Sequence, residues 1–143
     1  MAGGVKIVAN VAYLEKGIAD IMRKDPKICR AAMREASHLM KREAVKRAPI
    51  DEGHLSGAIL GGTFENENGV FGAEVKVPSN TPAAAYAIPM HDGEYNLGAN
   101  SLAKQAKVGV VVGPGYFSRM LTECRERILN AIAKKVINLR LHS

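Results

Sequence analysis

Residues 28–59, ICRAAMREASHLMKREAVKRAPIDEGHLSGAI, contain the transition that decides the fold. A basic amphipathic helix runs up to Ala48-Pro49, where the proline ring forces Ala48 out of the helical region and ends the helix. A tight acidic turn, Asp51-Glu52-Gly53, follows, and residues 55–59 then begin a hydrophobic segment with strand-forming character. The stretch therefore predicts a junction between a long helix and a sheet.

Two helices are expected on the N-terminal side of this junction. Apolar residues follow helical spacing over about residues 10–24, and Asn10 is a candidate N-cap. Asp25-Pro26 then begins the second helix, which is expected to span residues 26–47 because proline fits the first helical turn. Residues 5–8 are short and β-branched, so a brief strand and the lead into a helix are both open there.

A hairpin is expected after the junction, with arms at residues 55–64 and 70–77. The second arm alternates apolar and polar residues, as a half-buried strand does. Asn68-Gly69 supplies a strong signal for the turn. Gly61-Gly62 in the first arm indicates either a bulge or the close approach of a neighbouring backbone.

Beyond the hairpin, residues 83–90 fit a short third strand or a helical turn. Residues 91–101 are polar and rich in glycine, which predicts a mobile surface loop. Residues 106–113, AKVGVVVG, predict a central strand because their apolar residues are nearly continuous. The last helix is expected over residues 116–139. It would be about 36 Å long, which is long for a domain of this size and favours packing on another subunit.

These elements predict a single α+β domain over residues 1–143: two N-terminal helices, an antiparallel sheet of about four strands with a long hairpin, and a long C-terminal helix packed on the sheet. A chain of 143 residues suits one domain and buries about two thirds of the surface that it exposes when unfolded. The net charge of +6 permits contact with nucleic acid or with an acidic protein face and requires neither. We expect no signal peptide and no membrane span.

The two cysteines are expected to be structural. Cys29 and Cys124 each fall within a helical pattern at a position compatible with its apolar face, which favours buried free thiols in a reducing compartment. A disulfide between them stays open at this point. Neither a CxxC nor an HxxxH spacing occurs, so no zinc site is predicted.

No set of side chains in the sequence indicates catalysis. His91-Asp92 is the strongest candidate for acid–base or metal chemistry, but such a role needs further converging groups, and a surface loop is the favoured interpretation. Asp51-Glu52 is interpreted as a structural turn. The remaining candidates have no recognisable nucleophile or ligand context: His38, His54, His142, Ser56, Ser118 and Cys124. We therefore expect no enzyme, no cofactor and no metal.

Nucleic-acid binding is suggested by charge alone. The last predicted helix carries Arg125, Arg127, Lys134, Lys135 and Arg140, diluted by Glu123 and Glu126. Neither an aromatic platform nor a recognised binding module accompanies these bases. The pattern favours passive tolerance of a nearby phosphate backbone over sequence-specific recognition.

Residues 46–59, KRAPIDEGHLSGAI, resemble the hallmark of the HK97 gp10-like family of tailed-bacteriophage neck and tail-completion proteins. In that family a helix ends in Ala-Pro, and an acidic residue or threonine, a glycine and a leucine follow before a strand begins. Here Ala48, Pro49, Gly53 and Leu55 occupy those places, with Glu52 where the family commonly has threonine.

Two further segments are similar to the same family. Tyr86-Ala87, followed by His91-Asp92-Gly93, is similar to its Tyr-Ala segment that leads to an acidic residue and a glycine. The segment 114–117, which ends at Phe117, is similar to its entry into a long final helix. The resemblance covers most of residues 10–140.

This resemblance implies a non-enzymatic virion protein, assembled in the host cytoplasm. Such proteins form homo-oligomeric rings, hexamers or dodecamers, that join the DNA-filled head to the tail. They contact connector or head-completion proteins and tail proteins, and the passing DNA touches them without sequence specificity. The implied motif and assembly residues are Ala48, Pro49, Gly53, Leu55, Gly93 and Phe117. The rival hypothesis is a small basic DNA-binding accessory protein.

Overall fold

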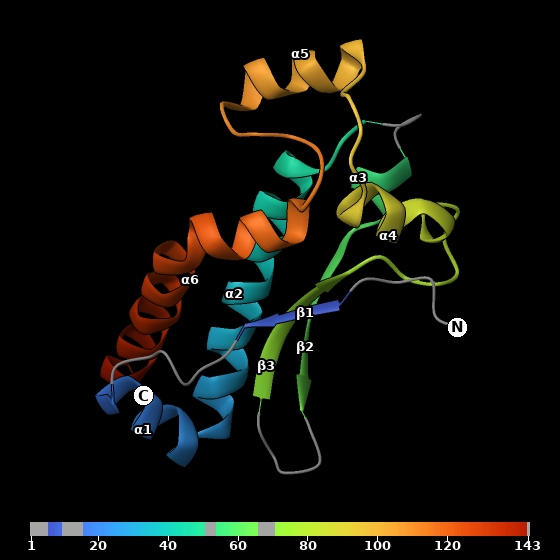
Figure 1. Ribbon diagram of the computed structural model, residues 1–143. Coiled ribbons are helices and arrows are strands. Elements are labelled where there is room, and N and C mark those ends of the chain that lie inside the picture. The colour runs from blue at the N-terminus through green and yellow to red at the C-terminus, as the bar shows by residue number, and fades with distance from the viewer. Residues whose placement is uncertain (1–5, 10–15, 51–53, 66–70, 143) are drawn as a thin grey trace.

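Helix α2 (Pro26–Arg47) is the centre of the molecule. The computed structural model describes residues 6–9, 16–50, 54–65 and 71–142, and in it α2 lies between a small sheet and the long C-terminal helix α6 (Tyr116–Leu141) (Figure 1). The predicted start of α2 is confirmed: Asp25 caps it by accepting the backbone N–H groups of Lys27 and Ile28 at 3.1 and 3.2 Å.

The C-terminal helix was expected to pack on the sheet, and this is wrong. It packs along α2 instead, and α2 covers the sheet. The reason lies in α2, whose buried residues extend around more than one side of the helix. Fully buried Ala32, Met33, Ala36 and Met40 show how continuous this apolar surface is, so α2 contacts α6 and the sheet at once.

The sheet has three antiparallel strands in the described residues, in the order β1 (Lys6–Ala9), β3 (Phe71–Lys76), β2 (Leu60–Glu65). The predicted hairpin is confirmed as the pair β2 and β3, in which Phe64 lies opposite Gly72. Its expected turn at Asn68-Gly69 lies outside the described residues. Of the two interpretations of residues 5–8, the strand is correct for residues 6–8, and residue 5 lies outside the described part of the chain.

The expected sheet of about four strands is therefore wrong, and the molecule is mostly helical. The predicted central strand at 106–113 instead contains the end of helix α5 (Ala99–Val108) and an irregular segment. Gly109 adopts a left-handed conformation with φ 74°, which ends α5 and turns the chain away. A run of valines broken by such a glycine is not a continuous strand.

Two other helices replace expected strand or loop. The first four residues of the expected hairpin arm, 55–58, belong to the short helix α3 (His54–Ala58). Residues 83–90, which left two alternatives open, belong mostly to helix α4 (Ala84–Asp92). The expected loop at 91–101 is helical at both ends, because α4 ends at Asp92 and α5 begins at Ala99.

The remaining expectations about the helices are partly tested. Helix α1 (Lys16–Lys24) confirms the end of the first predicted helix, while residues 10–15 lie outside the described part of the chain. Cys29 and Cys124 are both buried and free, as favoured. Helix α5 projects from the rest of the molecule as an arm (Figure 1).

Gly61 allows β2 to lie directly against α2. A Cβ atom at Gly61 would be 2.7 Å from the Ser37 carbonyl oxygen and 3.3 Å from the Lys41 Cβ, so any side chain displaces the helix. A Cβ at Gly62 would meet nothing within 4 Å. The close approach of a neighbouring backbone is thus the correct interpretation of this glycine pair, and Gly61 is the residue that requires it.

Candidate functional site

The residues of the family-like motif gather at one end of the molecule. Here the C-terminus of α2, helices α3 and α4 and the start of α6 meet, a region that we call the junction (Figure 1). Ala48, Leu55 and Phe117 are fully buried in the hydrophobic core there. Pro49 is buried as well. These side chains shape the junction from inside and do not themselves present a contact surface.

Of the two glycines in the motif, Gly93 lies in the described part of the chain. Gly93 ends α4 and donates its N–H to the Pro89 carbonyl at 2.8 Å. A Cβ at Gly93 would lie 2.5 Å from that same oxygen, so the turn requires glycine. Gly53 lies outside the described residues.

Hydrogen bonds join the separate motif segments to one another. Gly113 N–H donates to the Arg47 carbonyl (2.9 Å), Gly115 N–H to the His91 carbonyl (2.6 Å), and the Tyr116 hydroxyl to the Ala87 carbonyl (2.7 Å). The end of α2, the end of α4 and the start of α6 are thereby fixed against each other although they lie far apart in sequence.

Lys104 anchors the projecting arm to the junction, and sequence reasoning missed it. Its ammonium group on α5 donates to the carbonyl oxygens of Val45 and Ala48, both at 2.6 Å, and lies 3.3 Å from Ser56 Oγ. These are C-terminal carbonyls of α2, which lack helical partners, so a cation is favourable there. Burial lowers the pKa of Lys104. Ser101 adds a second anchor, because its Oγ accepts a hydrogen bond of 2.9 Å from the backbone N–H of Ile50.

His91, expected in a surface loop, is instead a buried residue of α4, and it caps α6. Its Nε2 accepts the backbone N–H of Ser118 at 3.3 Å, so the proton lies on Nδ1, which donates to Asp92 Oδ1 at 2.7 Å. Ser118 Oγ lies 3.4 Å from Nε2. The N-cap of α6 is Gly115, which has no side chain, and His91 satisfies an N–H of the first turn in its place.

A buried ion-pair network joins α2 to α6 beside the junction. Glu43 and Arg47 are 2% and 3% exposed, and Arg47 Nη1 lies 3.1 Å from Glu43 Oε1. Arg47 also donates to Glu123 Oε1 through Nε and Nη2, at 3.1 and 3.0 Å. Lys46 and Arg127 contact the Glu43 carboxylate at 2.7 and 3.2 Å. The Glu43 carboxylate is thus paired with three cationic side chains.

This network determines the charge of Glu43. Burial raises the pKa of its carboxyl group, but hydrogen bonds from Lys46, Arg47 and Arg127 outweigh burial and lower that pKa to about 2. Cys124 lies 3.6 Å from Glu43 Oε1, and burial raises the pKa of its thiol. The sequence signal for the network was the spacing of Glu43 and Arg47, which places an acid and a base on the same side of a helix.

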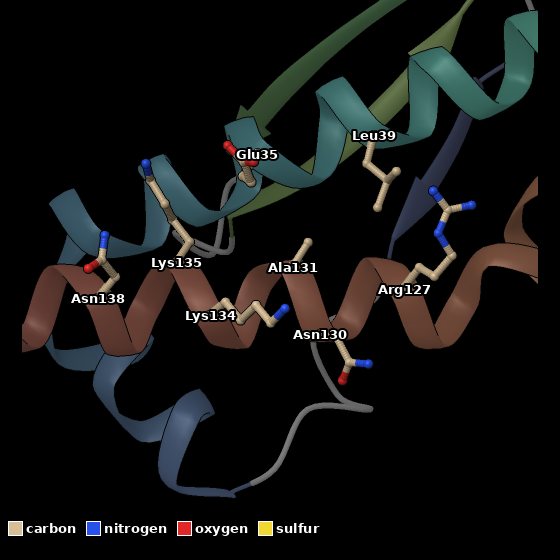
Figure 2. A pocket seen from close by; sticks show the side chains of 8 residues that line it. All are labelled: Glu35, Leu39, Arg127, Asn130, Ala131, Lys134, Lys135 and Asn138. Atoms are coloured by element: carbon tan, nitrogen blue, oxygen red, sulfur yellow. The ribbon is translucent and has the colours of Figure 1, made fainter.

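A groove of about 550 Å³ runs between α2 and α6, away from the junction (Figure 2). It begins at Arg127, the outer member of the ion-pair network, and continues toward the C-terminus of α6. Figure 2 shows side chains of α6 along the groove, opposite Glu35 and Leu39 of α2. The lining residues are Glu35 and Leu39 from α2, and Arg127, Asn130, Ala131, Lys134, Lys135 and Asn138 from α6. Lys134 and Lys135 form no ion pair and no hydrogen bond with other residues that the structure describes.

The described part of the chain contains neither a metal-binding cluster nor a membrane-spanning helix. No group of three or more His, Cys, Asp or Glu residues stands ready to hold a metal ion among those residues. No helix in residues 16–50, 54–65 or 71–142 is both long and apolar enough to cross a membrane. Comparison with protein-family models, with curated proteins and with solved structures finds no match to this chain.

Proposed function

We propose that this chain is a structural subunit of the tailed-phage neck, which assembles into a homo-oligomeric ring that joins the DNA-filled head to the tail and lets DNA pass. The proposal starts from the resemblance of residues 46–59 to the neck and tail-completion family. The role is one of assembly, and no residue is assigned a catalytic part in it.

The observation that carries the proposal is the meeting of the motif segments at the junction. Residues 46–59, 91–93 and 114–117 resemble the family in three separate parts of the sequence. Gly115 in the third segment donates its N–H to the His91 carbonyl in the second, and Gly113, which immediately precedes the third, donates to the Arg47 carbonyl in the first. A shared fold explains such convergence, because short motifs matched by chance have no reason to become neighbours in space.

The exposed features also suit a ring. Closed rings of identical subunits use contacts in which one face of a copy meets a different face of the next copy. Strand β2 lies at an edge of the sheet with Leu60 44% exposed, and edge strands pair readily with other chains. The arm offers a different surface, where Leu102 is 51% exposed.

The experiment is a mass measurement on the purified full-length chain by gel filtration with light scattering, followed by negative-stain imaging. We expect ring-shaped particles of six or twelve copies. Leu102→Asp places a charge on the arm and should reduce the particle to smaller species. Leu141→Asp, at the exposed C-terminal end of α6, is the matched control and should retain the ring. A monomer at every concentration up to the solubility limit would contradict the proposal.

The rival function, a small DNA-binding accessory protein, is favoured by one observation, the concentration of positive charge on α2 and α6. It predicts DNA binding by a monomer and no ring. The same mass measurement separates the two functions, because only the neck protein is expected to assemble without DNA.

A further inference from the structure

The positive charge of the chain is concentrated on its two long helices. Helices α2 and α6 contain thirteen of the twenty Lys and Arg residues and only four of the fourteen Asp and Glu residues. The rest of the chain carries seven bases and ten acids and is therefore acidic. A net charge of +6 understates how basic this helix pair is.

Two sets of charges on the helix pair differ sharply in their surroundings. Beside the junction, Arg47 is buried and bound to Glu43 and Glu123. In the groove, Lys134 and Lys135 form no ion pair with any residue that the structure describes, and Arg127 is 57% exposed although it touches Glu43. The groove therefore offers positive charge to a ligand, whereas the buried network does not.

The groove residues of α6 form a regular row of donors. Arg127, Asn130, Lys134 and Asn138 follow one another at spacings of three or four residues, so they lie on one side of the helix. The row covers about 16 Å at about 1.5 Å per residue. Guanidinium, ammonium and amide groups all donate hydrogen bonds to phosphate oxygens. The row is long enough to contact more than one phosphate of a single strand.

We propose that this groove binds the sugar-phosphate backbone of nucleic acid, without reading its sequence. An acidic helix from another protein is the other occupant that the charge allows, but such a helix needs apolar pockets for its anchoring side chains. The apolar residues that line the groove are Leu39, which is only 6% exposed, and Ala131. The groove therefore offers little apolar surface to a partner helix. The groove thus suits a polyanion better than an amphipathic helix.

The inference deepens the proposed function, since a ring through which DNA passes supplies such a polyanion, and it assigns the face that meets the DNA. Glu35 is the one acid in the lining, opposite the lysines, and it limits the number of phosphates that the groove accepts. We expect weak binding of one subunit, strengthened when several copies present their grooves together.

The test measures binding of the full-length protein to a labelled duplex oligonucleotide by fluorescence anisotropy over a series of salt concentrations. The double variant Lys134→Gln/Lys135→Gln removes two unpaired charges from the groove. We expect about tenfold weaker binding for each lysine in 0.1 M salt, and a plot of log affinity against log salt whose slope is smaller by about two.

The matched control is Lys41→Gln/Lys107→Gln, which changes the net charge equally. Lys41 lies on the side of α2 that approaches Gly61, and Lys107 lies on the arm. The control should retain both the affinity and the salt slope. Equal losses in the two double variants, or none in the groove variant, would overturn the inference.

Particle mass is measured on the same samples, so that the two proposals fail separately. If the protein forms rings and the groove variant binds DNA as tightly as the wild type, this inference alone is overturned. Groove-dependent binding by a chain that never assembles overturns the neck function alone. A groove variant that loses its ring but not its affinity for DNA identifies a contact between copies and also overturns the inference.

Discussion

Charged residues have different roles in the two halves of the α2–α6 pair. Beside the junction, Glu43 and Arg47 are almost completely buried and bound to each other. Toward the C-terminus of α6, Lys134 and Lys135 line an open groove and form no ion pair with described residues. One half joins the helices, and the other half leaves its charge available.

The difference teaches that counting charged residues does not locate a binding surface. Glu43 and Arg47 have lost their water and depend on each other, so removing one leaves the other without compensation. Exposed charges in the groove remain solvated, and their loss costs the fold little. The loss of stability on substitution therefore separates the two groups.

Glu43→Gln is expected to give the largest effect, a loss of about 3 kcal/mol in the free energy of unfolding. The substitution retains the size of the side chain but leaves Arg47, Lys46 and Arg127 facing a neutral group, and breaking a buried ion pair costs this much. Urea unfolding at neutral pH measures it. Glu126→Gln on exposed α6 surface is the control and should stay within about 0.5 kcal/mol of the wild type.

Acid should reproduce most of that loss in the wild-type protein. The pKa of Glu43 is about 2 in the folded state against an ordinary value of 4.5. Its contribution is therefore complete above about pH 4.5 and disappears as the pH falls toward 2, which amounts to about 3 kcal/mol. The measurement is the difference in unfolding free energy between wild type and Glu43→Gln across this range. The difference should shrink as the pH falls; a constant difference would show that the carboxylate charge is not the cause.

Sequence patterns predicted the long helices well because their signals are local. The cap at Asp25-Pro26 and the stop at Ala48-Pro49 act on the neighbouring backbone, so the bounds of α2 follow from them. The apolar row of α6 is equally explicit and predicted that helix to within two residues of its end. The hairpin of β2 and β3 was predicted from alternation and from Asn68-Gly69.

The failures came where tertiary contacts decide. The valine-rich run at 106–113 has strand propensity, but Gly109 in a left-handed conformation and the anchoring of Lys104 to α2 favour a helix followed by a turn. Of the candidate site, sequence named the groove bases of α6 but not their relation to α2. The pairing that distinguishes Arg47 from Lys134 depends on which helix faces which, and composition does not contain that information.

Gly61→Ala tests the side of α2 that faces the sheet. The added Cβ would lie 2.7 Å from the Ser37 carbonyl oxygen, a backbone atom that moves only if the whole helix moves. We expect a loss of about 2 kcal/mol from overpacking, measured by urea unfolding. Gly62→Ala, next along the strand, meets nothing within 4 Å and should be close to neutral. Equal effects of the two would mean that strand conformation, not helix contact, sets the cost.

Lys104→Met should give the smallest effect, a loss of about 1 kcal/mol, because it keeps the aliphatic stem but removes the hydrogen bonds to the carbonyls of Val45 and Ala48. Lys107→Met, on exposed surface of the same helix, is the matched control and should be neutral. Amide exchange along α5 adds a second measurement, since loss of the anchor should speed exchange there while α2 and α6 keep their protection. Unchanged exchange would show that Ser101 and the segment after Gly109 hold the arm without the lysine. If Lys104→Met destabilises the arm while the groove lysines can be replaced without loss of stability, then lysines of this chain divide into those that hold the fold and those that remain available to a ligand.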